Sequence, residues 1–182
     1  MNIIKKKVLE LSKGDIEAFN SLFILYYPKV KNFILVLIKN EEDSLDLAQD
    51  IFLSLWNNRS RLANVDSFNS YLFRIAKNKV YDYYREKISF EKYIKERDIT
   101  ADYDDSVKEI IDAKDLEMLI NITVENMPPR QKEVYKMSRI EGLSNDEIAN
   151  TLGISKRTVE THISNTLKAI KKLITVIFFL FV

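Results

Sequence analysis

Apolar residues recur at intervals of three and four along most of the chain, which is the spacing of one face of an α-helix. This pattern predicts helices within residues 1–39, with a break near Gly14, and over residues 41–58, 67–87, 113–127 and 129–141. Alternation at period two, the mark of β-strands, is scarce, and only 3 glycines and 3 prolines interrupt 182 residues. The pattern therefore predicts an all-α protein.

Residues 143–164 have the pattern of a short helix, a tight turn and a longer helix. Ser144 followed by Glu147 is typical of a capping box at a helix start. Gly153 can end that helix in the left-handed conformation, and Ser155 can cap the next one. Val159, Ile163, Leu167 and Ile170 are expected to face inward. The outward positions, Lys156, Arg157, Glu160, Thr161, Ser164 and Asn165, are polar, as in a DNA-binding helix-turn-helix.

The helix over residues 41–58 has two contrasting faces. Leu45, Ala48, Phe52 and Leu55 form its expected core face. The opposite face holds Asp43, Asp46, Asp50, Leu53 and Asn57, with Gln49 and Trp56 at its flank. Carboxylates beside exposed large apolar groups favour a protein-binding surface. The alternative is a solvated face whose acids complement the helix dipole.

The helix over residues 67–87 is rich in tyrosine and in basic residues. Its expected buried face holds Leu72, Ile75, Ala76, Val80 and Tyr83. Its expected outer face holds Tyr71, Arg74, Lys77, Asn78, Lys79, Tyr81, Tyr84, Arg85 and Lys87. Rings interleaved with cations are typical of a surface that binds single-stranded nucleic acid. The alternative is that most of the tyrosines belong to the core.

The net charge of +1 conceals an uneven distribution of charge along the chain. Residues 1–87 hold 14 basic and 11 acidic residues, residues 88–117 hold 5 and 10, and residues 118–182 hold 9 and 6. Two mildly basic blocks on either side of an acidic segment suit two contacts with one polyanion. We expect two small helical domains, residues 1–87 and 113–182, joined by an acidic linker over residues 88–112, with four helices in the second domain.

Composition restricts the chemistry. The chain has no cysteine and one histidine, which excludes disulfides, thiolate metal sites and a metal site built from histidines. No metal, cofactor or catalytic residue is expected, so the chain is predicted not to be an enzyme. No secretory signal follows Met1, which predicts a cytoplasmic protein.

The run LITVIFFLFV, residues 173–182, is uncharged but too short to span a bilayer. We expect it to form a last helical turn and a tail that pack on the second domain. The alternative is a docking strip for an inhibitor or a membrane.

Five segments carry a resemblance to a known family: GDIEAFNSLF (14–23), DLAQDIFLSLW (46–56), SFNSYLFRIAKNKVYDYYR (67–85), MPPRQKEVY (127–135) and GLSNDEIANTLGISKRTVETHI (142–163). The chain resembles the sigma-70 family of bacterial RNA polymerase initiation factors, and within it the small two-domain extracytoplasmic-function (ECF) group. The resemblance covers nearly all of residues 10–172. LuxR-type regulators share the helix-turn-helix segment, whereas DLAQDIF followed by YLFRIAKN is what distinguishes the sigma family.

The resemblance assigns roles to residues that match the family's motifs. The surface for the β′ coiled coil of core polymerase would hold Asp46, Gln49, Asp50, Phe52, Leu53 and Trp56. The part that opens and reads the −10 element would hold Asn58, Leu62, Tyr71, Arg74, Lys77, Asn78, Tyr81 and Arg85. The helix that reads the −35 duplex would offer Lys156, Arg157, Thr158, Glu160, Thr161, Ser164, Asn165 and Lys168.

One stretch departs from the family. Many members carry arginine where this chain has Glu160, Thr161 or His162. Because a glutamate can accept a hydrogen bond from cytosine N4, Glu160 is expected to read a cytosine rather than to hold a phosphate.

The resemblance implies a transcription initiation factor with defined partners: the β′ and β subunits of core RNA polymerase, promoter DNA and a membrane-linked anti-sigma factor, with no small-molecule substrate. The first alternative is a LuxR-type regulator that binds closed duplex as a dimer. It would need a sensory or receiver domain, and residues 1–87 show no βαβ pattern. A second alternative, a helical protein-binding module, leaves Lys156, Arg157 and Asn165 unexplained.

Overall fold

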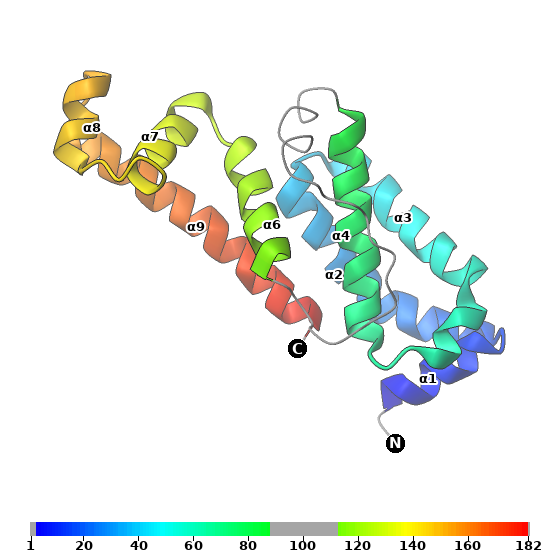
Figure 1. Ribbon diagram of the computed structural model, residues 1–182. Coiled ribbons are helices and arrows are strands. Elements are labelled where there is room, and N and C mark those ends of the chain that lie inside the picture. Colours follow the sequence, from blue (N-terminus) through cyan, green and yellow to red (C-terminus); the bar gives the residue numbers. More distant parts are fainter. Residues whose placement is uncertain (1–2, 88–112, 182) are drawn as a thin grey trace. The chain divides into compact units, whose positions relative to one another are not determined.

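A computed structural model describes residues 3–87 and 113–181 (Figure 1). The helices are α1 (Ile3–Ser12), α2 (Ile16–Ile38), α3 (Glu41–Asn57), the 3₁₀ helix η1 (Arg59–Asn64), α4 (Phe68–Glu86), α6 (Ala113–Glu125), α7 (Pro129–Arg139), α8 (Asn145–Leu152) and α9 (Lys156–Phe181). No strand occurs in these two ranges, which confirms the predicted all-α class. The predicted acidic linker, residues 88–112, lies outside the described residues.

The described residues form two compact units. The first contains α1 to α4 together with residues 176–182, and the second contains residues 113–175. The second unit includes α6, α7, α8 and most of α9, which are the four helices expected in the second domain.

The first unit is built on α2, the long apolar helix. Asp15 begins it by accepting a hydrogen bond from the backbone N–H of Ala18 at 2.9 Å. The helix continues through Pro28 and ends at Lys39, which takes the left-handed conformation at φ 58°. By length and composition alone α2 could cross a membrane. Here it is a core helix, because Leu22, Val30, Phe33, Ile34 and Leu37 are fully buried.

Short polar caps define where α3 and α4 begin. The side chain of Asn40 accepts hydrogen bonds from the backbone N–H groups of Glu42 and Asp43, at 3.0 and 3.2 Å. Between the predicted helices 41–58 and 67–87, residues 59–64 form the 3₁₀ helix η1. Ser67 then caps α4 by accepting from the backbone N–H of Ser70 at 3.3 Å. The caps satisfy N–H groups that have no partner inside their helices.

Two neighbouring tyrosines of α4 lie opposite to the prediction. Tyr84 is buried and donates a hydrogen bond to the backbone oxygen of Leu37 at 2.8 Å. Tyr83 is only half-buried, and its hydroxyl donates to Asp43. Partners from α2 and α3 therefore decide which ring turns inward.

In the second unit, a turn at Met127, Pro128 and Pro129 separates α6 from α7. Proline is favoured in the first turn of a helix, where its missing N–H is not needed, and α7 begins at Pro129. Glu125 at the end of α6 binds Lys132 at 3.0 Å and Lys136 at 2.7 Å across this turn. The α7 helix ends at Arg139, short of the expected residue 141.

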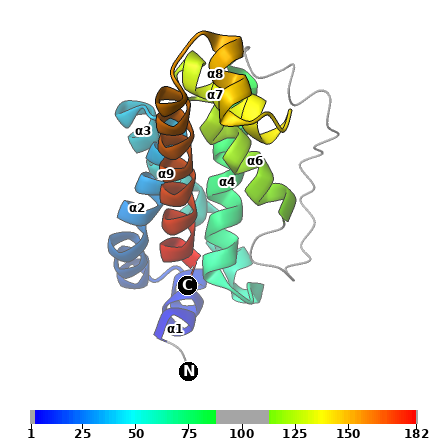
Figure 2. The same ribbon diagram turned by 90° about the vertical axis from the view of Figure 1, so that its left-hand side faces the viewer.

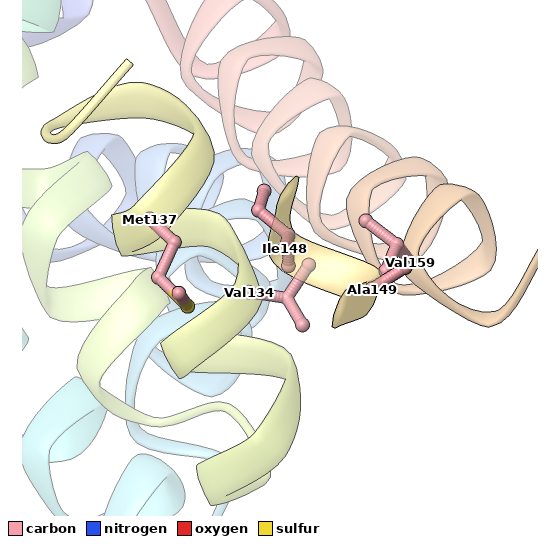
Figure 3. Close-up of a cluster of buried hydrophobic side chains, with 5 residues drawn as sticks. All are labelled: Val134, Met137, Ile148, Ala149 and Val159. Atoms are coloured by element: carbon pink, nitrogen blue, oxygen red, sulfur yellow. The ribbon is translucent and has the colours of Figure 1, made fainter. Parts of the chain in front are cut away.

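The predicted helix-turn-helix is present as α8 and α9. The Ser144 backbone N–H donates to the Glu147 carboxylate at 2.8 Å, and the Glu147 backbone N–H donates to the Ser144 hydroxyl at 3.3 Å. Gly153 takes the left-handed conformation at φ +64° and ends α8. Figure 3 shows the apolar cluster under this turn, formed by Val134, Met137, Ile148, Ala149 and Val159.

The α9 helix is one unbroken helix of 26 residues (Figures 1 and 2). Its buried positions include Val159, Thr166, Ile170, Leu173, Ile177 and Leu180. Leu167 was expected to face inward, but it is 44% exposed and Thr166 takes the inner position. Alternating steps of four and three keep this stripe on one side of the helix, and it continues into the apolar run at residues 173–182.

We predict that Gly153→Ala destabilises the second unit by about 1 kcal/mol, because an L-residue pays that much in the left-handed conformation. No atom lies within 4 Å of the added Cβ, so the loss reports the backbone alone. Urea unfolding of the full chain measures it. Gly153→Asn is the matched control and should lose less, because asparagine tolerates this conformation. Equal stability of wild type and Gly153→Ala would show that the turn is not left-handed.

Candidate polymerase-binding and DNA-binding surfaces

The outer side of α3 carries the acidic and apolar stripe that the sequence predicted. Asp46, Gln49, Asp50 and Leu53 are exposed and follow one another at steps of three, one and three. Leu53 is 59% exposed and stands beside these carboxylates. Asp50 is paired with Lys79 of α4, with 3.1 Å between Nζ and the carboxylate oxygen.

Two aromatic residues assigned to this surface are held by the first unit itself. Phe52 is 2% exposed, and its ring lies edge-on to Phe23 with 5.0 Å between centroids. The Phe52 side chain is therefore packed inside the first unit, because it stands four residues after Ala48 and three before Leu55, on their buried face. Trp56 is half-buried against Phe19, at 5.2 Å between centroids.

Arg59 fixes the remaining side of Trp56. Its guanidinium lies over the indole ring, 4.5 Å from the centroid, and also donates to the Trp56 backbone oxygen at 2.8 Å. Phe19, Phe23 and Tyr27 of α2 are half-buried next to this site. Their spacing of four residues was the signal that they form a continuous aromatic edge.

The α4 helix presents cations resting on tyrosine rings. The Arg74 guanidinium lies 5.5 Å from the centroid of Tyr71, and the Lys77 ammonium lies 5.6 Å from that of Tyr81. Tyr71, Arg74, Lys77 and Asn78 are half-buried, and Arg85 is exposed and paired with Asp82 at 3.1 Å. These residues share one side of α4, because steps of three and four return to the same helix face.

Two residues assigned to −10 DNA lie in the interior. Leu62 of η1 is 2% exposed and Tyr81 is 7% exposed, so their side chains are packed rather than presented. Asn58 is half-buried and donates its side-chain N–H to the Ser54 backbone oxygen at 2.9 Å. The side chains of Leu62 and Tyr81 therefore support this surface from inside. Direct contacts with DNA would come from the other residues assigned to the −10 element.

A cluster of three polar residues fastens the end of α4 to the start of α3. The Tyr83 hydroxyl donates to the Asp43 carboxylate, and the Lys87 ammonium contacts both the Tyr83 oxygen and, at 3.5 Å, Asp43. The hydrogen bond from Tyr83 holds the pKa of Asp43 below its ordinary value, with a further contribution from Lys87. Partial burial and the hydrogen bond to Asp43 raise the pKa of Tyr83. The cluster was not predicted, because residues 40 positions apart give no local signal.

The outer side of α9 holds the residues predicted to read duplex DNA. Lys156, Arg157, Glu160, Thr161, Ser164, Asn165 and Lys168 are exposed. Thr158 is half-buried, and its backbone N–H donates to the capping hydroxyl of Ser155 at 3.1 Å. The Thr161 hydroxyl is turned back onto the Arg157 carbonyl at 2.8 Å.

Lys156 has a partner inside the second unit. Its ammonium lies 2.8 Å from the carboxylate of Asp146 in α8, and this contact raises the pKa of Lys156. Glu160 lies one helical turn further on the same face. The start of the recognition helix is therefore less positive than its lysine and arginine suggest.

In the described part of the chain, no group of three or more His, Asp or Glu side chains could hold a metal ion. What the surfaces offer is a helix-turn-helix, a cationic and aromatic helix face, and an acidic and apolar helix face. Together they define a two-domain helical protein equipped for DNA and for a protein partner.

Comparison with known families agrees with this class. The sequence matches the model of sigma-70 region 2 over residues 22–88 and that of sigma-70, region 4 over residues 123–170. It is 26% identical to the ECF RNA polymerase sigma factor SigW of Bacillus subtilis, over 93% of this chain and 96% of SigW. It is 22% identical to the ferric citrate uptake sigma factor FecI of Escherichia coli, over 83% of this chain and 87% of FecI.

Among solved structures, the chain is similar to CnrH, described in complex with the cytosolic domain of CnrY. The identity is 23%, the coverage is 94% of this chain and 96% of CnrH, and the TM-score is 0.42.

The chain belongs to the sigma-70 family of RNA polymerase sigma factors, in its ECF group. It is therefore a transcription initiation factor, which binds core polymerase and directs it to promoters. The LuxR-type alternative is not favoured, because the match extends over region 2 as well as over the helix-turn-helix.

We predict that Tyr83→Phe raises the pKa of Asp43 towards its ordinary value, because the largest cause of the depression is the tyrosine hydrogen bond. Since the folded pKa is lowered, the contact stabilises above about pH 4, and that contribution is lost as the pH falls through the folded pKa. An NMR titration of the Asp43 carboxyl measures the change. Lys87→Gln is the comparison and should shift the pKa less. An identical Asp43 titration in wild type and Tyr83→Phe would remove the proposed cause.

Proposed function

We propose that three helix faces divide the work of promoter recognition. The α3 face with Asp46, Gln49, Asp50 and Leu53 binds core polymerase, with Trp56 at its edge. The α4 face with Tyr71, Arg74, Lys77, Asn78 and Arg85, together with Asn58 before η1, holds the melted −10 strand. The outer face of α9 reads the −35 duplex. The observation that carries this proposal is the different chemistry of the three outward faces on helices whose other faces are buried.

Each proposed contact follows from the chemistry of its surface. Exposed Leu53 beside carboxylates suits a protein partner with apolar and basic groups. Tyr71 offers a ring on which an unstacked base can stack, while Arg74 and Lys77 meet phosphates. On α9, Arg157 and Lys168 suit phosphates, and Glu160 suits the N4 donor of a cytosine.

Because little net positive charge is available to meet DNA phosphates, tight promoter binding requires core polymerase. Non-specific affinity for DNA comes mainly from cations that neutralise phosphates. In the second unit, Lys156 is paired with Asp146 and Glu160 adds negative charge to the same face. Core polymerase would raise the affinity by holding the α4 face and the α9 face on one promoter, which raises their effective concentration.

The remaining assignments belong to the same proposal and rest on the family. We propose that domain boundaries lie at residues 87 and 113, that the chain works in the cytoplasm and catalyses no reaction itself, and that a membrane-linked anti-sigma factor controls it. Contact with the β subunit of core polymerase is proposed on the same basis.

Run-off transcription with core polymerase and a cognate promoter tests the proposal. We predict initiation that depends on this chain and that falls at least about tenfold with Leu53→Glu, which places a charge in the centre of the protein contact. The matched control is Ile140→Glu in the second unit, where the isoleucine is 75% exposed and belongs to none of the three faces. Equal loss in both variants, or none in Leu53→Glu with core polymerase still bound, would contradict the α3 assignment.

We also predict that Asp146→Asn strengthens promoter binding by the holoenzyme several-fold, because it releases Lys156 for a phosphate. One further phosphate contact should steepen the dependence of log affinity on log salt by about 0.9. A salt series of fluorescence-anisotropy titrations measures both quantities. The double variant Asp146→Asn with Lys156→Gln is the control and should lose the gain. An unchanged salt slope in Asp146→Asn would show that Lys156 meets no phosphate.

A further inference from the structure

The last part of α9 has an exposed apolar side that neither promoter recognition nor the helix-turn-helix uses. Leu173, Ile177 and Leu180 are buried and continue the inner stripe of the helix. Ile174, Phe178 and Phe179 lie on the other side and are 45%, 57% and 69% exposed. Two exposed phenylalanines next to an exposed isoleucine form an apolar patch that is costly to leave in water.

A cluster of positive charge directly precedes this patch. Lys168, Lys171 and Lys172 are exposed on the same side of α9. Residues 173–182 contain no charged residue. The exposed side of the helix therefore changes within one turn from three cations to a surface that is apolar apart from Thr175.

The patch also lacks the polar groups that a specific protein partner would read. Its exposed hydroxyl, Thr175, already donates to the Lys171 backbone oxygen at 2.8 Å. Protein interfaces surround their apolar centre with a polar rim and carry about one hydrogen bond per 100–200 Å². Here the side chains on the exposed side offer apolar contact and positive charge, without groups that would fix a partner's orientation.

We propose that this end of α9 is a membrane-surface binding site for anionic phospholipid. Ile174, Phe178 and Phe179 enter the boundary between headgroups and acyl chains, while Lys171 and Lys172 contact the lipid phosphates. Lysine suits this position because its long stem can lie along apolar groups while the ammonium stays in water. Anionic lipid attracts each nearby cation, so binding responds to lipid charge and to salt.

The dimensions of the segment restrict the mode of binding. The nine helical residues 173–181 rise about 13 Å, which is less than half of the roughly 30 Å hydrocarbon core. The segment therefore enters one leaflet and does not span the bilayer. A single short apolar anchor binds weakly and reversibly, so the protein exchanges between the membrane surface and core polymerase. This surface is separate from the three faces proposed for promoter recognition.

Vesicle flotation with the full chain tests the proposal. The probes are vesicles of phosphatidylcholine alone and vesicles of phosphatidylcholine mixed with phosphatidylglycerol. We expect the chain to float with the mixed vesicles, and to bind them about tenfold or more weakly when high salt screens the lysines. The double variant Phe178→Ser with Phe179→Ser should lose binding, and Lys171→Gln with Lys172→Gln should lose the preference for anionic lipid.

The matched control is Ile24→Ser with Leu25→Ser, which removes two neighbouring exposed apolar residues from α2 and should float like wild type. Far-UV circular dichroism and run-off transcription should be unchanged in the phenylalanine variant, so a failed lipid site is distinguishable from a failed initiation factor. The proposal is overturned if the wild type floats with neither vesicle, or if the phenylalanine variant floats as well as wild type. It is also overturned if sedimentation shows that Phe178 and Phe179 instead hold two copies together.

Discussion

The packing of α2 against α3 is the contact on which the surface of the first unit depends. Phe23 meets Phe52 edge-on, and Phe19 meets Trp56 in the same way. Once Ala48, Phe52 and Leu55 are buried against α2, the helical repeat turns Asp46, Gln49, Asp50 and Leu53 outward. The acidic and apolar stripe is therefore a consequence of the core. A change that rotated α3 by one residue would bury carboxylates and expose rings together, so the residues that fix the core packing also fix which side chains face the proposed partner.

In the helix-turn-helix, too, the core packing determines which polar face is turned outward. A capping box begins α8, Gly153 ends it, and the cluster of Val134, Ile148 and Val159 sets the angle of α9. On the outer face of α9, the pairing of Lys156 with Asp146 reduces the positive charge that is free to meet DNA. As the proposed −35 reader, α9 would contribute choice of sequence more than affinity, which fits a protein that works as a subunit of the polymerase.

Local patterns in the sequence were sufficient for the all-α class, for the helix-turn-helix with its capping box, and for the outward stripe of α3. They were insufficient where a side chain is placed by a partner distant in sequence. Tyr84 turns inward because the Leu37 carbonyl accepts its hydroxyl, whereas Tyr83 finds Asp43. The burial of Leu62 and Tyr81 and the pairs of Lys79 with Asp50 and Lys156 with Asp146 likewise depend on the packing of helices. In α9, periodicity allowed either Thr166 or Leu167 inside, and the apolar residue was the wrong choice.

We propose that promoter affinity belongs to the complex with polymerase and not to the free chain. The most direct measurement is a fluorescence-anisotropy titration of cognate promoter DNA with the chain alone, with core polymerase alone and with both, at physiological salt. We predict specific binding only when both are present, and weak, sequence-independent binding by the chain alone. Tight, sequence-specific binding of promoter duplex by the purified chain alone would contradict it.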